Sequence, residues 1–186
     1  MSYTFLFAAR RVLNQESEYW RKFTDPHRLK NAKEIIGLDR ILNEDLVKAD
    51  RESDEYWKQT YISEATETGL YKSPEYVLSK MVPREKFNFL AVVVEPSEDC
   101  RKIVLDEYDF LGYELLDTSF EISVLTNCGG FDESFLKEDL NPYGLIDDHE
   151  KAYTIAKSIL ENNPDEYHAD TNVIAVWKHK YIGRKE

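Results

Sequence analysis

Residues 87–95 form an almost unbroken apolar run, Phe-Asn-Phe-Leu-Ala-Val-Val-Val-Glu, which ends at Pro96. β-branched residues dominate its second half, and its length is that of a strand, so it predicts a central strand covered on both faces. Such a strand needs apolar layers packed on either side of a sheet. The chain has 186 residues, 42% of them hydrophobic and 13% aromatic, so it can bury a core of this kind without covalent staples.

Three other segments show strand-like patterns. Residues 119–126 alternate between apolar and polar side chains, which predicts a half-buried strand. Residues 172–182 contain a second continuous apolar run and predict another buried strand. Residues 3–13 are also apolar, but their periodicity leaves a strand and a short helix equally open.

Helical spacing of apolar residues predicts one helix over residues 29–49 and another over residues 152–160. Asp147 is expected to cap the second helix, and Asn162-Asn163-Pro164 is expected to end it. A third helix is predicted to begin at Ser73-Pro74-Glu75, because proline is favoured at the first helical position.

These segments predict one α+β domain over residues 1–186, with helices packed against a mixed or mainly antiparallel sheet. The order expected in the C-terminal half is strand, strand, loop, helix, strand. No repeat, low-complexity segment or linker divides the chain.

The net charge of −12 is distributed unevenly along the sequence. Residues 1–60 carry 11 basic and 11 acidic side chains, whereas residues 95–170 carry 20 acidic and only 5 basic ones. A negative potential of this kind repels nucleic acid and anionic membranes and attracts basic proteins or cations. Simple solubility is the plainer explanation of the same excess.

The sequence shows no apolar run near the roughly 20 residues that cross a bilayer, and no basic segment followed by an apolar one at its start. The expected location is therefore the cytoplasm, with no membrane contact. In that compartment Cys100 and Cys128 are expected to be free thiols.

Cys128 precedes Gly129-Gly130 and is the candidate nucleophile of an enzyme, with His149 or His168 as candidate bases. The surrounding acidic residues disfavour a thiolate, so we expect Cys128 to be a small structural side chain rather than a catalytic one.

Two short segments, Asp147 to Glu150 and Asp165 to Asp170, mix carboxylates with a histidine and so resemble metal-ligand clusters. The first also looks like a helix N-terminus, where carboxylates are favoured without any metal. The chain contains no zinc, calcium, phosphate-loop or nucleophile-elbow motif, so no metal and no cofactor is predicted.

The favoured hypothesis is an acidic module that binds and neutralises or regulates a basic protein, in the manner of a bacterial immunity protein or a nucleic-acid mimic. Aromatic residues beside charges would serve as its anchors. A small enzyme centred on Cys128 or on an acidic pocket, and a structural domain without site chemistry, are the alternatives. The predicted binding residues are Asp132, Glu133, Glu138, Asp139, Asp147, Asp148, Glu150, Asp165, Glu166, Asp170, Trp57 and Tyr61.

Overall fold

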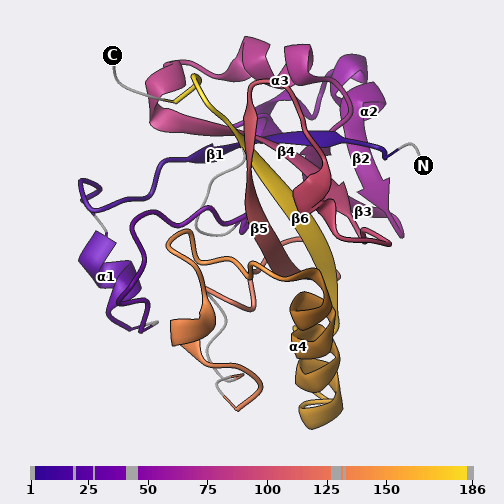
Figure 1. Ribbon diagram of the computed structural model, residues 1–186. Coiled ribbons are helices and arrows are strands. Elements are labelled where there is room, and N and C mark those ends of the chain that lie inside the picture. Colours follow the sequence, from indigo (N-terminus) through magenta and orange to yellow (C-terminus); the bar gives the residue numbers. More distant parts are fainter. Residues whose placement is uncertain are drawn as a thin grey trace.

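The structure is a computed structural model that describes residues 3–18, 20–26, 28–40, 46–126, 131 and 133–183. Its centre is a six-stranded antiparallel sheet with the strand order β2-β3-β1-β4-β6-β5 (Figure 1). The strands are β1 (Leu6–Arg11), β2 (Thr60–Ser63), β3 (Thr66–Tyr71), β4 (Phe87–Val94), β5 (Tyr108–Asp117) and β6 (Thr171–His179).

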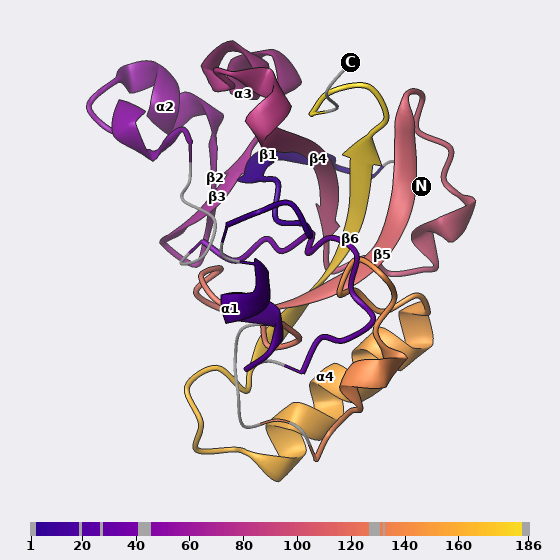
Figure 2. The ribbon, with the colours of Figure 1, turned by 90° about the vertical axis from the view of Figure 1, so that its left-hand side faces the viewer.

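In Figures 1 and 2, α2 and α3 lie near one end of this sheet and α4 near the other, while α1 lies to one side of it. They are α1 (Trp20–Thr24), α2 (Asp54–Gln59), α3 (Pro74–Lys80) and α4 (His149–Asn162). Four 3-10 helices accompany them, at Lys48–Asp50, Arg84–Lys86, Cys100–Lys102 and Lys137–Asp139. The α3 helix packs on β1 and β3, and α4 packs on β5 and β6, so the two ends of the sheet have separate apolar clusters.

The predicted central strand is confirmed as β4, which pairs with β1 on one side and β6 on the other. All its residues from Phe87 to Val93 are buried. Alternate side chains enter different clusters, because Leu90 and Val92 face one layer while Ala91 and Val93 face the other. The apolar run is continuous because both faces of the strand are buried, as the sequence predicts.

The prediction for the C-terminal helix is confirmed, with one change at its start. Its apolar stripe, including Ala152, Ile155 and Ile159, is buried against the sheet. Asp148 rather than Asp147 is the N-cap, and its carboxylate accepts a hydrogen bond of 2.9 Å from the backbone N–H of Lys151. The helix ends at Asn162, as the following Asn163-Pro164 predicts.

The structure also decides the predictions for three shorter segments. Residues 3–13 contain β1, so the strand alternative is the correct one. The run at 172–182 is β6. The helix predicted at Ser73-Pro74-Glu75 is α3, where the Ser73 hydroxyl accepts a hydrogen bond from the backbone N–H of Tyr76.

The helix predicted over residues 29–49 is wrong. Residues 28–33 form turns and a bend, residues 34–39 are extended, and residues 41–45 lie outside the described part of the chain. The backbone N–H groups of Ile35 and Ile36 donate to the carbonyls of Leu13 and Tyr143, not to residues one helical turn earlier. Five consecutive residues, 35–39, are buried. An amphipathic surface helix buries one stripe of side chains, whereas this extended segment lies between two layers and buries five residues in a row.

The strand predicted over residues 119–126 is also wrong, because only Ser123 makes a bridge, to Leu116. The Asp117 carboxylate accepts hydrogen bonds from the backbone N–H groups of Glu121 and Ile122, and Phe120 has a positive φ of 59°, so the segment turns back on itself. The second strand of this half is β5 instead. A bulge at Gly112 interrupts its apolar alternation, which explains why its pattern is weak.

Candidate functional site

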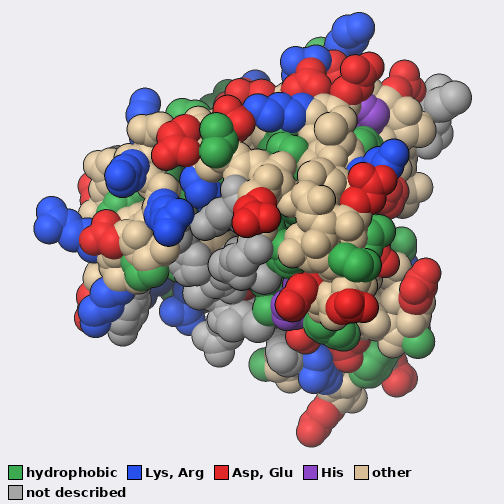
Figure 3. Space-filling view, turned by 90° about the horizontal axis from the view of Figure 1, so that it is seen from below, with side chains coloured by type: hydrophobic (Ala, Val, Ile, Leu, Met, Phe, Trp, Pro, Cys, Tyr) green, Lys and Arg blue, Asp and Glu red, His purple; other side chains and the backbone are tan. Residues whose placement is uncertain are grey.

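The densest negative charge lies along α4 and the segments on either side of it. We define the acidic surface as Glu133, Glu138, Asp139, Asp147, Asp148, Glu150, Glu161, Asp165, Glu166 and Asp170. Figure 3 shows acidic side chains gathered on the α4 side of the molecule, at the right of the view, while basic side chains gather at the left. Two contacts hold the segment before α4 alongside the helix: Lys151 pairs with Asp139 at 3.5 Å, and Asn162 donates to Ser134 at 3.4 Å.

The carboxylates of this surface are mostly exposed. Asp148 is the most engaged, because it caps α4 and pairs with Arg101 at 3.4 Å. Asp139 and Glu161 pair with lysines of α4. The remaining members form no ion pair with any residue that the structure describes; they are Glu133, Glu138, Asp147, Glu150, Asp165, Glu166 and Asp170. Asp132, the other predicted member, lies outside the described residues.

Local structure explains part of this charge. Asp148 is the N-cap of α4 and Glu150 lies in its first turn, where the free backbone N–H groups and the helix dipole favour a carboxylate. Asp147 accepts a hydrogen bond of 2.7 Å from the side chain of Asn141. Helix capping does not account for Asp165, Glu166 and Asp170, because they follow the end of α4.

Exposed apolar side chains interrupt the acidic surface at three positions. Tyr167 is 75% exposed between Glu166 and His168, and Leu136 and Leu160 are 63% and 41% exposed. Aromatic and aliphatic side chains surrounded by charge are typical anchors of protein interfaces. Tyr167 was not among the predicted anchors, although the sequence places it as an aromatic residue in the charged loop that follows Pro164.

The two predicted aromatic anchors lie elsewhere. Trp57 is on α2 and Tyr61 on β2, at the end of the molecule away from α4 in both ribbon views (Figures 1 and 2). Trp57 is 46% exposed, and its indole N–H donates to the carbonyl of Arg51 at 2.8 Å. Tyr61 is partly buried against the core. Neither side chain contributes to the acidic surface.

The residues considered for catalysis do not converge within the described part of the chain. His149 begins α4, and its Nε2 lies 2.9 Å from the carbonyl oxygen of Pro96. His168 follows the other end of a 14-residue helix, about 20 Å away along its axis, and its Nδ1 lies 2.8 Å from Asp117. Cys128 lies outside the described residues. Burial, together with the charges of Asp99 and Glu98, raises the pKa of the Cys100 thiol to about 11.

A buried polar cluster beneath the β5 edge was missed by sequence reasoning. Glu114 and Asp39 are 0% and 1% exposed. The Ser123 hydroxyl donates to Glu114 Oε1 at 2.8 Å, and the Ser123 backbone N–H donates to Asp39 at 3.0 Å. Burial is the main cause that raises the pKa of Glu114, to about 8, and the nearby charge of Asp39 adds to it. The cluster holds the 35–39 segment against the sheet and has no opening to solvent at these two carboxyls.

Among the described residues, no group of three or more histidine, cysteine and acidic side chains is arranged to hold a metal ion. No helix in the same part of the chain has the length and apolar character needed to cross a membrane.

The chain matches no family model, and the comparisons with curated proteins and with solved structures found no similar protein. Arguments about function therefore rest on the surface and its chemistry.

Proposed function

We propose that this protein binds a basic protein partner through the acidic surface on and beside α4. The observation that carries the proposal is the set of seven exposed carboxylates that lack an ion pair with any described residue, grouped around one helix and its flanking segments. Like charges placed together in this way repel one another, so they cost stability unless a cationic partner neutralises them.

The surface also offers the apolar contacts that an interface needs. Charge steers the encounter and selects the partner, whereas buried aromatic and aliphatic anchors supply most of the affinity. Tyr167 stands among Asp165, Glu166 and Asp170 and is the strongest anchor available there. Leu160 lies at the same end of α4.

An inhibitor or immunity role is one form of this proposal, in which the partner is a cationic toxin or a nucleic-acid-binding protein. The enzyme alternative is weaker, because His149 and His168 lie at opposite ends of α4 and face different partners. A purely structural role would leave the clustered charge without an explanation beyond solubility.

A pair of variants with equal net charge tests the proposal. In the first, Glu133, Glu138, Asp165 and Glu166 are replaced by lysine; all four belong to the acidic surface. In the second, Glu52, Glu64, Glu85 and Asp106 are replaced by lysine; these are exposed and lie outside it. Binding of a fluorescent oligoarginine peptide is measured by anisotropy at low and at physiological ionic strength.

We expect the acidic-surface variant to bind the peptide at least about tenfold more weakly at low salt, and the control variant to keep most of the affinity of the wild type. Both variants replace three glutamates and one aspartate by lysine, so they differ only in where the replaced residues lie. Equal losses in the two variants would show that the peptide senses net charge alone, and the acidic surface would then not be a binding site.

A further inference from the structure

A concave region lies on the α1 side of the molecule, and basic residues predominate around it. It is a hollow of about 720 Å³ between α1 and the extended segment that follows it. Its lining residues are Gln15, Trp20, Arg21, Thr24, Asp25, Leu29, Lys30 and Ala32. A volume in the range of roughly 300–1,000 Å³ is typical of small-molecule sites.

We define the basic arm as residues 20–26 and 28–33, several of which line this hollow. It contains five lysine and arginine residues and a single acidic residue, Asp25, in a chain whose net charge is −12. The total charge of residues 1–60 does not reveal this basic excess, because acidic residues elsewhere in the same 60 residues cancel it. A local positive potential of this kind favours an anionic ligand.

The polar groups around the hollow are not engaged with the rest of the described protein. The side chains of Gln15, Trp20, Arg21, Asp25 and Lys30 make no hydrogen bond or ion pair with any residue that the structure describes. The Thr24 hydroxyl differs, since it donates to the Trp20 carbonyl at 3.0 Å and so holds the last turn of α1 in place.

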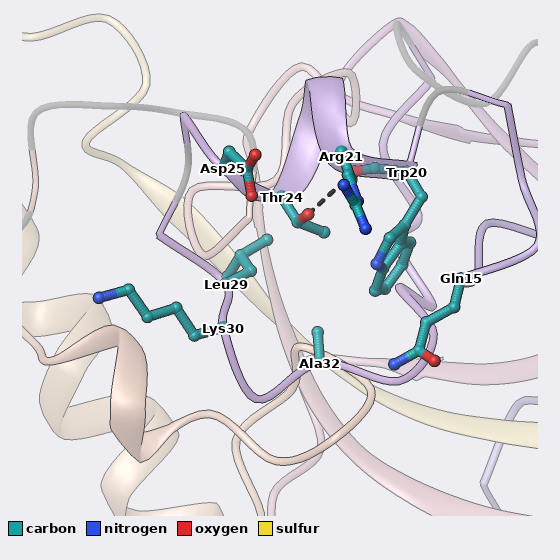
Figure 4. Close-up of a pocket in the computed structure, with 8 residues that line it drawn as sticks. All are labelled: Gln15, Trp20, Arg21, Thr24, Asp25, Leu29, Lys30 and Ala32. Carbon is teal, nitrogen blue, oxygen red and sulfur yellow. Dashed lines mark hydrogen bonds between the residues drawn. The ribbon is translucent and has the colours of Figure 1, made fainter.

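Figure 4 shows how these groups are disposed. The side chains of Trp20 and Arg21 extend side by side from α1 into the hollow, and Gln15 reaches toward the same space from an adjacent loop. Leu29 and Ala32 form its apolar floor and are buried in the core beneath. Lys30 lies at the rim with its ammonium group directed outward.

We propose that this hollow binds a mononucleotide. The indole of Trp20 provides a flat face on which a base can stack, and Gln15 and Asp25 provide acceptors for base N–H groups. Arg21 lies beside the ring and can hold the phosphate by paired hydrogen bonds, with Lys30 adding positive charge at the rim. Leu29 and Ala32 exclude water from the lower side of the ligand.

A single nucleotide fits better than a nucleic-acid strand. A strand extending from the hollow would carry many phosphates past a protein whose net charge is −12, and that field repels a polyanion. A monophosphate carries at most two negative charges and can stay within the basic arm. The site is separate from the acidic surface, so this inference goes beyond the proposed function and does not depend on it.

Calorimetric titration of the wild-type protein with adenosine 5′-monophosphate, adenosine and inorganic phosphate tests the proposal. We expect the nucleotide to bind with a dissociation constant below about 1 mM. Adenosine and inorganic phosphate should each bind at least about tenfold more weakly. Adenosine lacks the phosphate that Arg21 would hold, and phosphate lacks the base that would stack on Trp20. In ¹⁵N NMR spectra, the indole resonance of Trp20, assigned with Trp20→Phe, should shift on titration.

Two variants locate the phosphate. Arg21→Gln should weaken nucleotide binding about tenfold, through loss of the charge-assisted hydrogen bonds. Lys33→Gln is the matched control: it removes one charge from the basic arm, does not line the hollow, and should change the affinity less than about twofold.

Four outcomes would overturn the proposal. They are no binding at millimolar nucleotide, equal affinity for inorganic phosphate and the nucleotide, equal losses in Arg21→Gln and Lys33→Gln, and much tighter binding of a short single-stranded oligonucleotide. The second and third would indicate an unspecific anion patch, and the fourth would indicate a nucleic-acid groove. The oligoarginine experiment is unaffected by any of them, so the two proposals can fail separately.

Discussion

Glu114 lies on β5 with its carboxyl group buried beneath the extended segment that contains Leu38 and Asp39. One of its oxygens accepts hydrogen bonds from the Ser123 hydroxyl and the Leu115 backbone N–H. The other oxygen, Oε2, has no partner within the described residues. A buried carboxyl group in this environment holds its proton to an unusually high pH, since burial disfavours the charged form.

This single residue predicts a pH dependence of stability. The pKa of Glu114 is raised from 4.5 to about 8 in the folded protein, so the folded state retains a proton that the unfolded state loses above pH 4.5. The contribution of Glu114 to the free energy of unfolding therefore falls as pH rises from about 5 to about 8. The loss is on the order of 2–4 kcal/mol over this window.

The glutamine in Glu114→Gln cannot ionise. Between pH 5 and pH 8, the free energy of unfolding of this variant should therefore fall less than that of the wild type. Urea unfolding at several pH values measures the difference. Glu166→Gln, an exposed member of the acidic surface, is the control and should leave the curve of the wild type unchanged. Parallel curves for Glu114→Gln and the wild type would mean that Glu114 ionises normally in the folded protein.

At the scale of single elements, α4 is the clearest case of a pattern that carries over into structure. Its apolar residues recur at helical spacing, and the same residues are buried against β5 and β6. Segment 29–40 has a similar spacing yet is not helical: residues 29–33 form turns and a bend, and residues 35–39 are extended and buried between two layers. Periodicity predicts a helix correctly when a segment has one buried face and fails when it has two.

Adjacent residues on α4 test which side faces the core. Ile159 is 0% exposed, whereas its neighbour Leu160 is 41% exposed. Ile159→Ala should lower the free energy of unfolding by about 2–5 kcal/mol, through lost burial and a cavity. Leu160→Ala should cost less than about 1 kcal/mol. Urea midpoints with an unchanged slope measure both; a larger loss for Leu160 would show that the helix is rotated from the orientation described.

At the scale of the whole molecule, the described charges are separated. The acidic surface lies on and beside α4, whereas the basic arm contains α1; the two regions approach each other where the Lys33 backbone N–H donates to the Pro142 carbonyl at 2.8 Å. Charges further apart than about 10 Å are largely screened at 0.1 M salt, so the parts of the two regions that lie farther apart than this each present their own sign to a ligand. A protein of this kind can bind a cationic protein on one side and an anionic small molecule on the other.

This separation predicts that the two regions act independently. The four lysine replacements in the acidic surface should leave nucleotide affinity within about twofold of the wild type at physiological salt, and Arg21→Gln should likewise leave oligoarginine binding unchanged. Calorimetry and anisotropy on both proteins measure the two effects. A strong effect of either change on the other ligand would mean that the regions are coupled through the fold or through net charge.

The features that depend on local chemistry were predictable from the sequence. The β4 run, the β6 run, the stripe of α4 and the serine cap of α3 each reflect a preference carried by neighbouring residues, and together they predict the α+β class. The acidic excess of residues 95–170 was equally visible. The binding role assigned to it remains a prediction.

Features that depend on contacts between distant segments were decided only by the tertiary structure. Residues 35–39 are extended because Leu13 and Tyr143 accept their backbone hydrogen bonds, and those partners come from other parts of the chain. Glu114 is buried beneath the 35–39 segment, and Ser123 donates a hydrogen bond to it from across a turn. Trp57 and Tyr61 lie away from the acidic surface, and Tyr167 lies within it, since only the path of the chain in space determines which exposed side chains share one face.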